Sequence, residues 1–282
     1  LANRVGSTRH ADLLRDSLPA GIAWFGALPR TDDSLPERHL GLLQAAEVSD
    51  LAARLDLLAD ALAATTAVDL PPTVNFAMAP APVVSPRLAG QCIAVARDTA
   101  YGFIYPANLE TLQQLGVTLR FFSPLAGEPL PACDAVWLPG GYPELHAPTL
   151  ARNTALWTAL RSHVEAGQAV LAECGGMMSL FESVTDKAGV SHPFAGLLPG
   201  RAVMQQRLTA LGMQSVVLPE GRLQGHTFHY SKSETPLPPL CHAQTPDGRA
   251  GEAIYRQGRL TASYVHLYFP SNPMAVAALF SP

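Results

Sequence analysis

The sequence predicts an α/β protein with a mostly parallel sheet, because short apolar runs alternate with helical patterns after residue 90. Four of these runs are typical of buried strands: residues 92–96, 117–122, 135–138 and 169–172. Two segments between them have helical character, 108–115 and 153–166, and each is followed by a glycine that can end a helix. Strands separated by helices of this length imply a parallel sheet that is covered on both faces.

The last third of the sequence contains further strand patterns, at residues 215–218, 225–230 and 262–269. Before residue 67 the pattern is that of another α/β unit. An apolar run at 20–28 predicts a strand that Pro29 stops, and leucines at 51, 55, 58 and 62 form one face of a helix predicted over 47–66.

A proline-rich stretch separates these two regions, since five prolines occur between residues 68 and 90. Proline removes backbone donors and fixes φ, which favours an extended linker. We therefore predict three segments, 1–66, a linker at 67–89, and 90–282. The first residue is Leu1 and no signal-peptide pattern follows it, so we expect the N-terminus to have been cut from a longer chain.

The composition excludes several classes of protein. Of the 282 residues, 48% are hydrophobic and 15% are charged, which allows a large core, and the net charge of −4 comes without a basic stripe for nucleic acid. Apolar runs are too short to span a membrane. The four cysteines form no C-x-x-C pair, which argues against a zinc knuckle or a disulfide scaffold, so we expect a reduced cytoplasm.

The segment 169–178, AVLAECGGMM, is a candidate for the catalytic nucleophile. An apolar strand ends, Cys174 follows after one residue, and two glycines precede a helical pattern, as in a nucleophile elbow. The start of a helix supplies free N–H groups and a positive dipole end, which we expect to favour the thiolate. The alternative is a buried structural cysteine before a turn.

A second strand end, in AVWLPGGYPE at 135–144, also runs into glycines. Ligands bind beyond the carboxyl ends of parallel strands, so the N–H groups of Gly141 and Gly175 are candidate donors to an oxyanion. A simple β-turn is the alternative. Glu144 either faces a substrate pocket or is a solvated loop carboxylate, and the second interpretation is favoured for a loop.

The candidate base is His266, in the segment TASYVHLYF at 261–269. A thiol nucleophile needs a base within hydrogen-bond reach, and the two are often far apart in sequence. Taken alone, His266 is also consistent with a core histidine whose hydrogen bonds are satisfied.

Together these segments resemble a known family. The motifs LPGGYPELHAPTLARN, AECGGMM, GHTFHYS and ASYVHLYF are similar to those of the cobyrinic acid a,c-diamide synthases, class I glutamine amidotransferases of cobalamin biosynthesis. The resemblance covers 90–282, and NRVGSTRH and LPERHLGL resemble segments late in the family's ATP-binding domain. It implies a class I glutamine amidotransferase domain preceded by part of a P-loop-type, dethiobiotin synthetase-like α/β domain.

The resemblance also implies a reaction. Cys174 would attack the side-chain amide of glutamine to give a thioester and ammonia, with His266 as base and Gly141 and Gly175 as oxyanion donors. Ammonia would then amidate the a and c carboxylates of a cobyrinic-acid-type tetrapyrrole, activated by ATP with Mg²⁺ in the intact enzyme. Glutamine and the tetrapyrrole are the expected partners, and a homodimer is left open.

Two departures from the family pattern stand out. Many class I amidotransferases carry Glu two residues after the histidine, but the a,c-diamide synthases that this chain resembles also lack it and commonly have a second His there. This chain has Tyr268 at that position, a modest deviation that leaves the group orienting His266 unknown. The chain also has no G-x-x-x-x-G-K-[ST] phosphate loop.

In a strand, His226 and His229 would point to opposite faces, which disfavours a shared metal, and we expect no metal site. Asn3 resembles an adenine-side asparagine, or is a turn residue.

Several alternatives remain open at this point. The same reaction could act on hydrogenobyrinic acid or on nickel sirohydrochlorin, because these motifs do not encode the metal content of a tetrapyrrole. A stand-alone cysteine hydrolase of the same fold is a second alternative, and a binding module without catalysis is a third. The presence of both Cys174 and His266 argues against the third.

Overall fold

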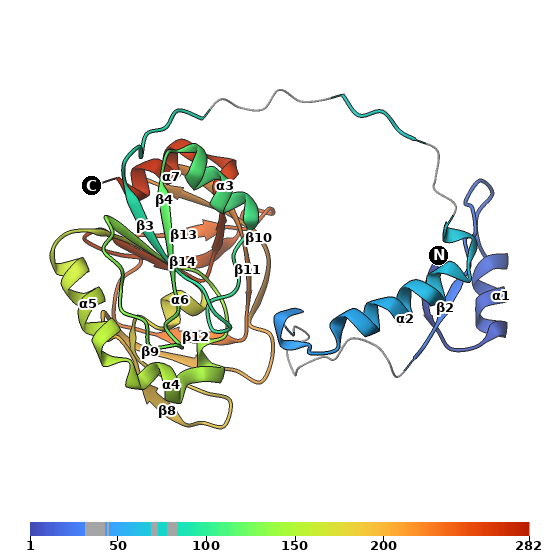
Figure 1. Ribbon diagram of the computed structural model, residues 1–282, viewed down its shortest axis with the longest axis horizontal. Helices are drawn as coiled ribbons and strands as arrows, with labels where there is room; N and C mark the ends of the chain where they lie inside the picture. Colours follow the sequence, from blue (N-terminus) through green and yellow to red (C-terminus); the bar gives the residue numbers. More distant parts are fainter. Residues whose placement is uncertain (32–42, 44, 69–72, 78–83, 282) are drawn as a thin grey trace. The chain divides into compact units, whose positions relative to one another are not determined.

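The computed structural model describes residues 1–31, 43, 45–68, 73–77 and 84–281. The chain divides into two compact units, Leu1–Ala81 and Pro82–Pro282 (Figure 1). The prolines at 71, 72, 80 and 82, on which the predicted linker depends, lie outside the described residues, as does the segment LPERHLGL. Leu88 is fully buried in the core of the second unit.

The first unit contains a small parallel pairing of β1 (Ala2–Val5) and β2 (Ala27–Pro29), with α1 (Thr8–Asp16) between them in the chain. The strand predicted at 20–28 is wrong over most of its length. Gly21 and Gly26 adopt φ values of 90° and 123°, in the left-handed region that favours glycine, so the chain turns there and the strand begins only at Ala27.

The helix predicted from the leucine spacing is present as α2 (Leu51–Ala63). Short 3₁₀ turns precede and follow it, η1 (Ala45–Glu47) and η2 (Thr66–Val68). No residue of α2 is buried, and the side chain of Leu55 is 50% exposed. The periodicity therefore predicted the helix correctly, and its four leucines are half-buried or exposed in the part of the chain that the structure describes.

The second unit is built on one ten-stranded sheet. In spatial order its strands are β16 (His266–Tyr268), β11 (Gly221–His229), β10 (Ala210–Leu218), β13 (Cys241–Gln244), β14 (Ala250–Gln257), β15 (Leu260–Ser263), β6 (Ala169–Glu173), β5 (Ala135–Leu138), β3 (Cys92–Ala96) and β4 (Thr118–Phe122). The five strands from β15 to β4 pair in parallel, and the others pair antiparallel. This confirms the predicted α/β class.

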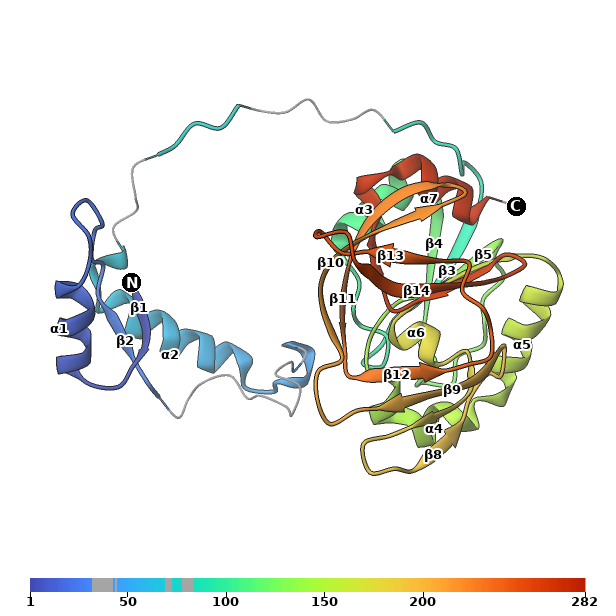
Figure 2. The same ribbon diagram turned by 180° about the vertical axis from the view of Figure 1, so that it is seen from behind.

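Helices cover both faces of the parallel half (Figures 1 and 2). The helices α3 (Pro106–Gln114) and α7 (Pro273–Phe280) pack on one face, while α4 (Ala147–Arg152) and α5 (Thr154–Glu165) pack on the other. Because side chains alternate along a strand, the neighbours Val136 and Trp137 of β5 enter different core clusters.

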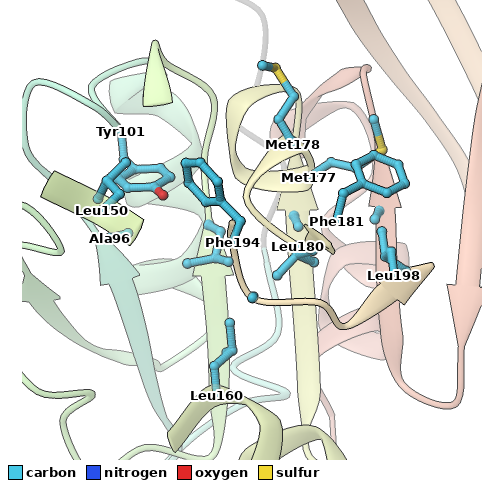
Figure 3. Packing of buried hydrophobic residues seen from close by; sticks show 14 of the residues in the cluster. Ala96, Tyr101, Leu150, Leu160, Met177, Met178, Leu180, Phe181, Phe194 and Leu198 are labelled. Carbon is cyan, nitrogen blue, oxygen red and sulfur yellow. The ribbon is translucent and has the colours of Figure 1, made fainter. Parts of the chain in front are cut away.

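A second, four-stranded sheet adjoins α4 and has the order β12 (Ser231–Glu234), β9 (Leu198–Met204), β7 (Phe181–Thr185) and β8 (Ser191–Pro193). Figure 3 shows how it joins the main core: Phe181 packs beside Met177 and Leu198. Large apolar side chains of this kind hold the segment after β6 against the sheet.

The strand predicted at 262–269 is divided in two, because the chain bends at Tyr264 and Val265 between β15 and β16. After the bend, β16 pairs with β11 at the far edge of the sheet. Six strands separate β16 from β5 in the sheet order, yet Phe269 packs on Trp137 of β5 with ring centroids 4.9 Å apart. The sheet is therefore curled, and its edge strand returns to the parallel half.

Candidate active site

Cys174 lies at the turn between β6 and the short helix α6 (Gly175–Met178). Its backbone has φ 46° and ψ −106°, and among the described residues only Arg4 shares a positive φ without being glycine. Such a conformation costs about 1–3 kcal/mol and persists only where the surrounding structure enforces it. Here the N–H of Cys174 donates to the carbonyl oxygen of Ser263 at 2.7 Å, which anchors the turn to β15. The geometry is that of the predicted nucleophile elbow.

The glycines beside Cys174 are required by close packing. A Cβ on Gly175 would lie 2.8 Å from the carbonyl oxygen and 3.0 Å from the nitrogen of Gly141, so the two candidate oxyanion donors are neighbours. The first distance is shorter than real Cβ contacts and the second is tighter than most of them, and Gly141 itself has φ 158°. A Cβ on Gly140 would overlap the imidazole of His266. The loop after β5 therefore contacts both the cysteine turn and the histidine.

His266 is buried at the start of β16, directly opposite His226 of β11. The ring of Phe103 packs edge-on against its imidazole, with centroids 4.4 Å apart. Among the described residues, His266 Nδ1 has no hydrogen-bond partner. His266 is therefore not a core histidine with satisfied hydrogen bonds, which was the alternative interpretation of the sequence.

The backbone next to His266 is fixed by two buried side chains that the sequence analysis missed. Glu173 Oε1 accepts from the N–H of Leu267 at 2.8 Å, while its Oε2 accepts from Trp137 Nε1 at 2.9 Å. Asn108 Nδ2 donates to the carbonyl of Leu267 at 2.8 Å. Tyr268, at the position where other amidotransferases carry Glu, is 42% exposed. The strand that carries His266 is thus held through its backbone.

The thiol of Cys174 donates to the carbonyl oxygen of Phe228 at 4.0 Å, and within the described residues no hydrogen bond joins it to His266. Burial raises the pKa of Cys174, and the nearby carboxylates of Glu144, Glu252 and Glu173 raise it further. A hydrogen bond from the backbone of Gly175 lowers the pKa, but its effect is smaller than that of burial. Burial, with the charges of His226 and His229, lowers the pKa of His266 to about 3. The free site therefore holds a neutral thiol and a neutral imidazole.

This charge state corrects the expectation that the helix start favours the thiolate. The helix α6 has only four residues, and the loss of water around the sulfur outweighs its dipole. The expectation that Glu144 is a solvated loop carboxylate is also wrong, because Glu144 is buried and only 7% exposed. It lies in the 3₁₀ turn η3 (Pro143–His146), which begins two residues after Gly141.

His226 and His229 lie on opposite faces of β11, as the strand periodicity predicts. His226 lines a pocket of about 370 Å³ together with other residues around the base: Phe103, Tyr105, Met213, Gly225, His266 and Tyr268. His229 instead pairs with Glu252 of β14 at 3.0 Å. No group of three or more His, Cys, Asp or Glu side chains in the described ranges is arranged to hold a metal ion.

None of the helices that the structure describes is long and apolar enough to cross a lipid bilayer.

The curled sheet with its cysteine turn after β6 defines the class of protein, a glutamine amidotransferase of the class I α/β fold. Residues 92–274 match the family described as the CobB/CobQ-like glutamine amidotransferase domain. The chain belongs to this family.

Curated relatives match the whole length of this chain. The hydrogenobyrinate a,c-diamide synthase of Stutzerimonas stutzeri (strain A1501) is 57% identical over 284 residues, and the match covers 66% of that protein. The cobyrinate a,c-diamide synthase of Herminiimonas arsenicoxydans is 43% identical over 286 residues, with 65% of it covered. The chain thus spans just under two thirds of their lengths. A solved glutamine amidotransferase is 20% identical, with a TM-score of 0.47 over 66% of this chain and 96% of that one.

Proposed function

We propose that the unit Pro82–Pro282 hydrolyses glutamine and supplies the ammonia for amidation of a tetrapyrrole. The observation that carries the proposal is the strained Cys174 at a strand-to-helix turn, beside a loop whose Gly140 packs against the imidazole of His266. A nucleophile with a nearby base and a pair of backbone donors is the arrangement that acyl transfer requires.

In the proposed first step, Cys174 sulfur attacks the amide carbon of glutamine while His266 takes the thiol proton. The carbonyl oxygen becomes negative and is held by the N–H groups of Gly141 and Gly175. The C–N bond then breaks, His266 gives its proton to the leaving nitrogen, and ammonia departs from a glutamyl thioester. In the second step His266 takes a proton from water, the hydroxide attacks the thioester, and the proton returns to the sulfur as glutamate leaves.

Both groups begin the first step neutral. Burial lowers the pKa of His266 to about 3, so its ring is unprotonated at neutral pH, and burial raises the pKa of the Cys174 thiol, so the proton must pass to His266 as the sulfur attacks. No proton has to be exchanged with solvent between the two steps.

The proposed acceptor is hydrogenobyrinate, amidated at its a and c carboxylates. Support comes from the names of the 57% identical relative and of a 55% identical one from Pseudomonas aeruginosa, both hydrogenobyrinate a,c-diamide synthases. Activation of the carboxylates by ATP with Mg²⁺ is proposed for a protein of the relatives' length. Since the described residues offer no cluster of metal ligands, no residue of this chain is assigned to that step.

Cobyrinate is the second candidate acceptor, because the 43% identical relative carries that name. Hydrogenobyrinate is metal-free and cobyrinate contains a metal, so comparing the amidation of the two acceptors distinguishes the two candidates. The full-length protein is given ATP, Mg²⁺, glutamine and either hydrogenobyrinate or cobyrinate, and the product is weighed by mass spectrometry. We expect two carboxyl-to-amide conversions per molecule of hydrogenobyrinate. Faster conversion of cobyrinate would show that cobyrinate is the acceptor instead.

The glutaminase half of the proposal is tested in the same assay with Cys174→Ser. Amidation with glutamine should be lost, while amidation with free ammonia should persist because ammonia bypasses the thioester. Cys241→Ser, at a half-buried position of β13, is the matched control and should retain both activities. Equal loss with both nitrogen sources would make Cys174 a structural residue.

A further inference from the structure

His229 and Glu252 form a buried polar cluster to which the proposed mechanism assigns no role. The side chain of His229 is only 4% exposed, and both of its ring nitrogens are engaged. Nδ1 lies 2.9 Å from the carbonyl oxygen of Ser231, and Nε2 lies 3.0 Å from Glu252 Oε1. Thr227, on the same face of β11, also donates to Glu252 Oε1, at 3.5 Å.

These partners determine how many protons the cluster holds. A carbonyl oxygen only accepts hydrogen bonds, so His229 Nδ1 must carry a hydrogen. An ionised carboxylate also only accepts, so His229 Nε2 needs a hydrogen as well, which makes the ring an imidazolium. Moving that proton to Glu252 leaves the pair with the same number of protons. In both cases the pair is electrically neutral as a whole.

The ring of Tyr264 favours the form with the charge on His229. The two rings are stacked, with centroids 3.8 Å apart and planes inclined by 9°. A cation over the face of an aromatic ring is attracted by the ring quadrupole. Tyr264 occupies the bend between β15 and β16, so this stack also connects His229 to the segment that leads to His266.

The cluster adjoins the nucleophile through two neighbouring backbone contacts. The sulfur of Cys174 donates to the carbonyl of Phe228, the residue before His229. The N–H of Cys174 donates to the carbonyl of Ser263, the residue before Tyr264. A charge on His229 or Glu252 therefore acts on the sulfur over a short distance, through an interior that screens charges weakly.

Within the described residues, the charged groups that act on the pKa of Cys174 are carboxylates. Besides burial, the carboxylates of Glu144 from η3, Glu252 from β14 and Glu173 from β6 all raise the pKa of Cys174. The charges of His226 and His229 act on the base, whose pKa they lower after the larger effect of burial. His229 is in direct hydrogen-bond contact with one of the three carboxylates.

We propose that His229 is a positioning residue of this site: as the cation of a buried, hydrogen-bonded pair with Glu252, it balances the charge of that carboxylate beside the turn that carries Cys174. The role rests on the glutaminase function proposed above, in which the sulfur must become negative. His229 does not touch glutamine in this proposal. It acts through the electrostatic potential at the sulfur.

Alkylation of Cys174 by iodoacetamide measures this role, because only the thiolate reacts. The rate is followed against pH in the whole chain, and peptide mapping separates Cys174 from the other three cysteines. His229→Gln removes the cation and leaves Glu252 without an offset, so the pH midpoint should rise and the rate at pH 7.5 should fall by roughly tenfold. Glu252→Gln removes the anion, so its midpoint should fall or stay unchanged.

The double variant His229→Gln/Glu252→Gln restores the charge balance and should return the midpoint to that of the unaltered chain. A merely structural role predicts that the two single changes act in the same direction and that their effects accumulate. That result, or an unchanged midpoint in His229→Gln, would overturn the proposal.

The matched control is His192→Gln, which breaks a second His–carboxylate pair, with Asp186 at 3.3 Å in the hairpin of β7 and β8. It should leave the alkylation profile unchanged. Thermal unfolding of each variant establishes that it is folded, and the isosteric Glu252→Gln keeps the proposal testable if His229→Gln does not fold. Because alkylation needs no glutamine, a chain without glutaminase activity would refute the proposed function and leave this measurement valid.

Discussion

At the scale of single residues, the chemistry depends on His266 being a neutral base in an enclosed position. Replacing it with glutamine keeps a polar side chain and removes the base. We expect the turnover of glutamine hydrolysis by His266→Gln to fall by about 10²–10⁴-fold, the usual contribution of a positioned general base. A coupled assay for glutamate measures this.

The control for that change is His242→Gln, at an exposed position of β13. It should hydrolyse glutamine at the normal rate. If His266→Gln also did so, His266 would be removed from the mechanism, and the carbonyl-bound thiol of Cys174 would need another base.

Gly140 is the second residue on which the site depends, because only a residue without a side chain fits beside His266. A methyl group there would overlap the imidazole of His266, so the ring or the loop must move. Since a misplacement of about 1 Å can cost 10²-fold in rate, Gly140→Ala should lower glutamine hydrolysis strongly while the protein stays folded. Turnover and thermal unfolding are measured together.

Gly6→Ala serves as the comparison, because a Cβ at Gly6 has no atom within 4 Å and its backbone needs no positive φ. Its activity and its unfolding temperature should be unaltered. Normal activity in Gly140→Ala would mean that His266 tolerates displacement, which contradicts the enclosed site described above.

At the scale of secondary-structure elements, Glu173 of β6 connects three strands through hydrogen bonds to Trp137 of β5 and Leu267 of β16. Burial raises the pKa of this carboxyl from 4.5 to about 8, against the effect of the two hydrogen bonds. The folded state thus binds a proton more tightly than the unfolded state does. The resulting stability is fully present below pH 4.5 and is lost as the pH rises through about 8.

Glu173→Gln should therefore destabilise the fold in a pH-dependent way. The amide cannot accept from both donors, so one buried hydrogen bond is lost at a cost of about 1–3 kcal/mol. Because the unaltered chain itself loses stability between pH 5 and about 8, the difference between the two proteins should shrink over that range. Urea unfolding at both ends of the range measures it, with Glu165→Gln, at an exposed position of α5, as the neutral control.

At the scale of the whole molecule, the last part of the first unit contains an exposed cleavage site. Phe76 is 87% exposed and lies outside any helix or strand. Brief treatment with chymotrypsin should therefore cut first after Phe76 and leave the fragment 77–282, because proteases act on exposed segments without regular structure. Mass spectrometry identifies the fragment.

Phe76→Ser should remove this first cut, and the fragment should keep its reactivity at Cys174. An initial cut within the second unit would contradict the division of the chain at Ala81 and Pro82.

The sequence by itself determined the local geometry. The strand β6, the turn at Cys174 and the helix that follows occupy ten consecutive residues, and the same is true of β5 with its glycine loop. Helices α2, α3 and α5 were likewise predicted, because apolar spacing and terminal glycines act over a few residues. The strand at 20–28 was predicted wrongly because Gly21 and Gly26 turn the chain within it.

Only the tertiary structure decided which distant residues meet. In the folded chain His266 meets Gly140, Glu144 is buried and His229 pairs with Glu252, and none of these follows from spacing along the chain. They depend on which strands pair and on how far the sheet closes. The charge state of Cys174 also follows from this closure, because burial and nearby carboxylates outweigh the local helix start that the sequence displays.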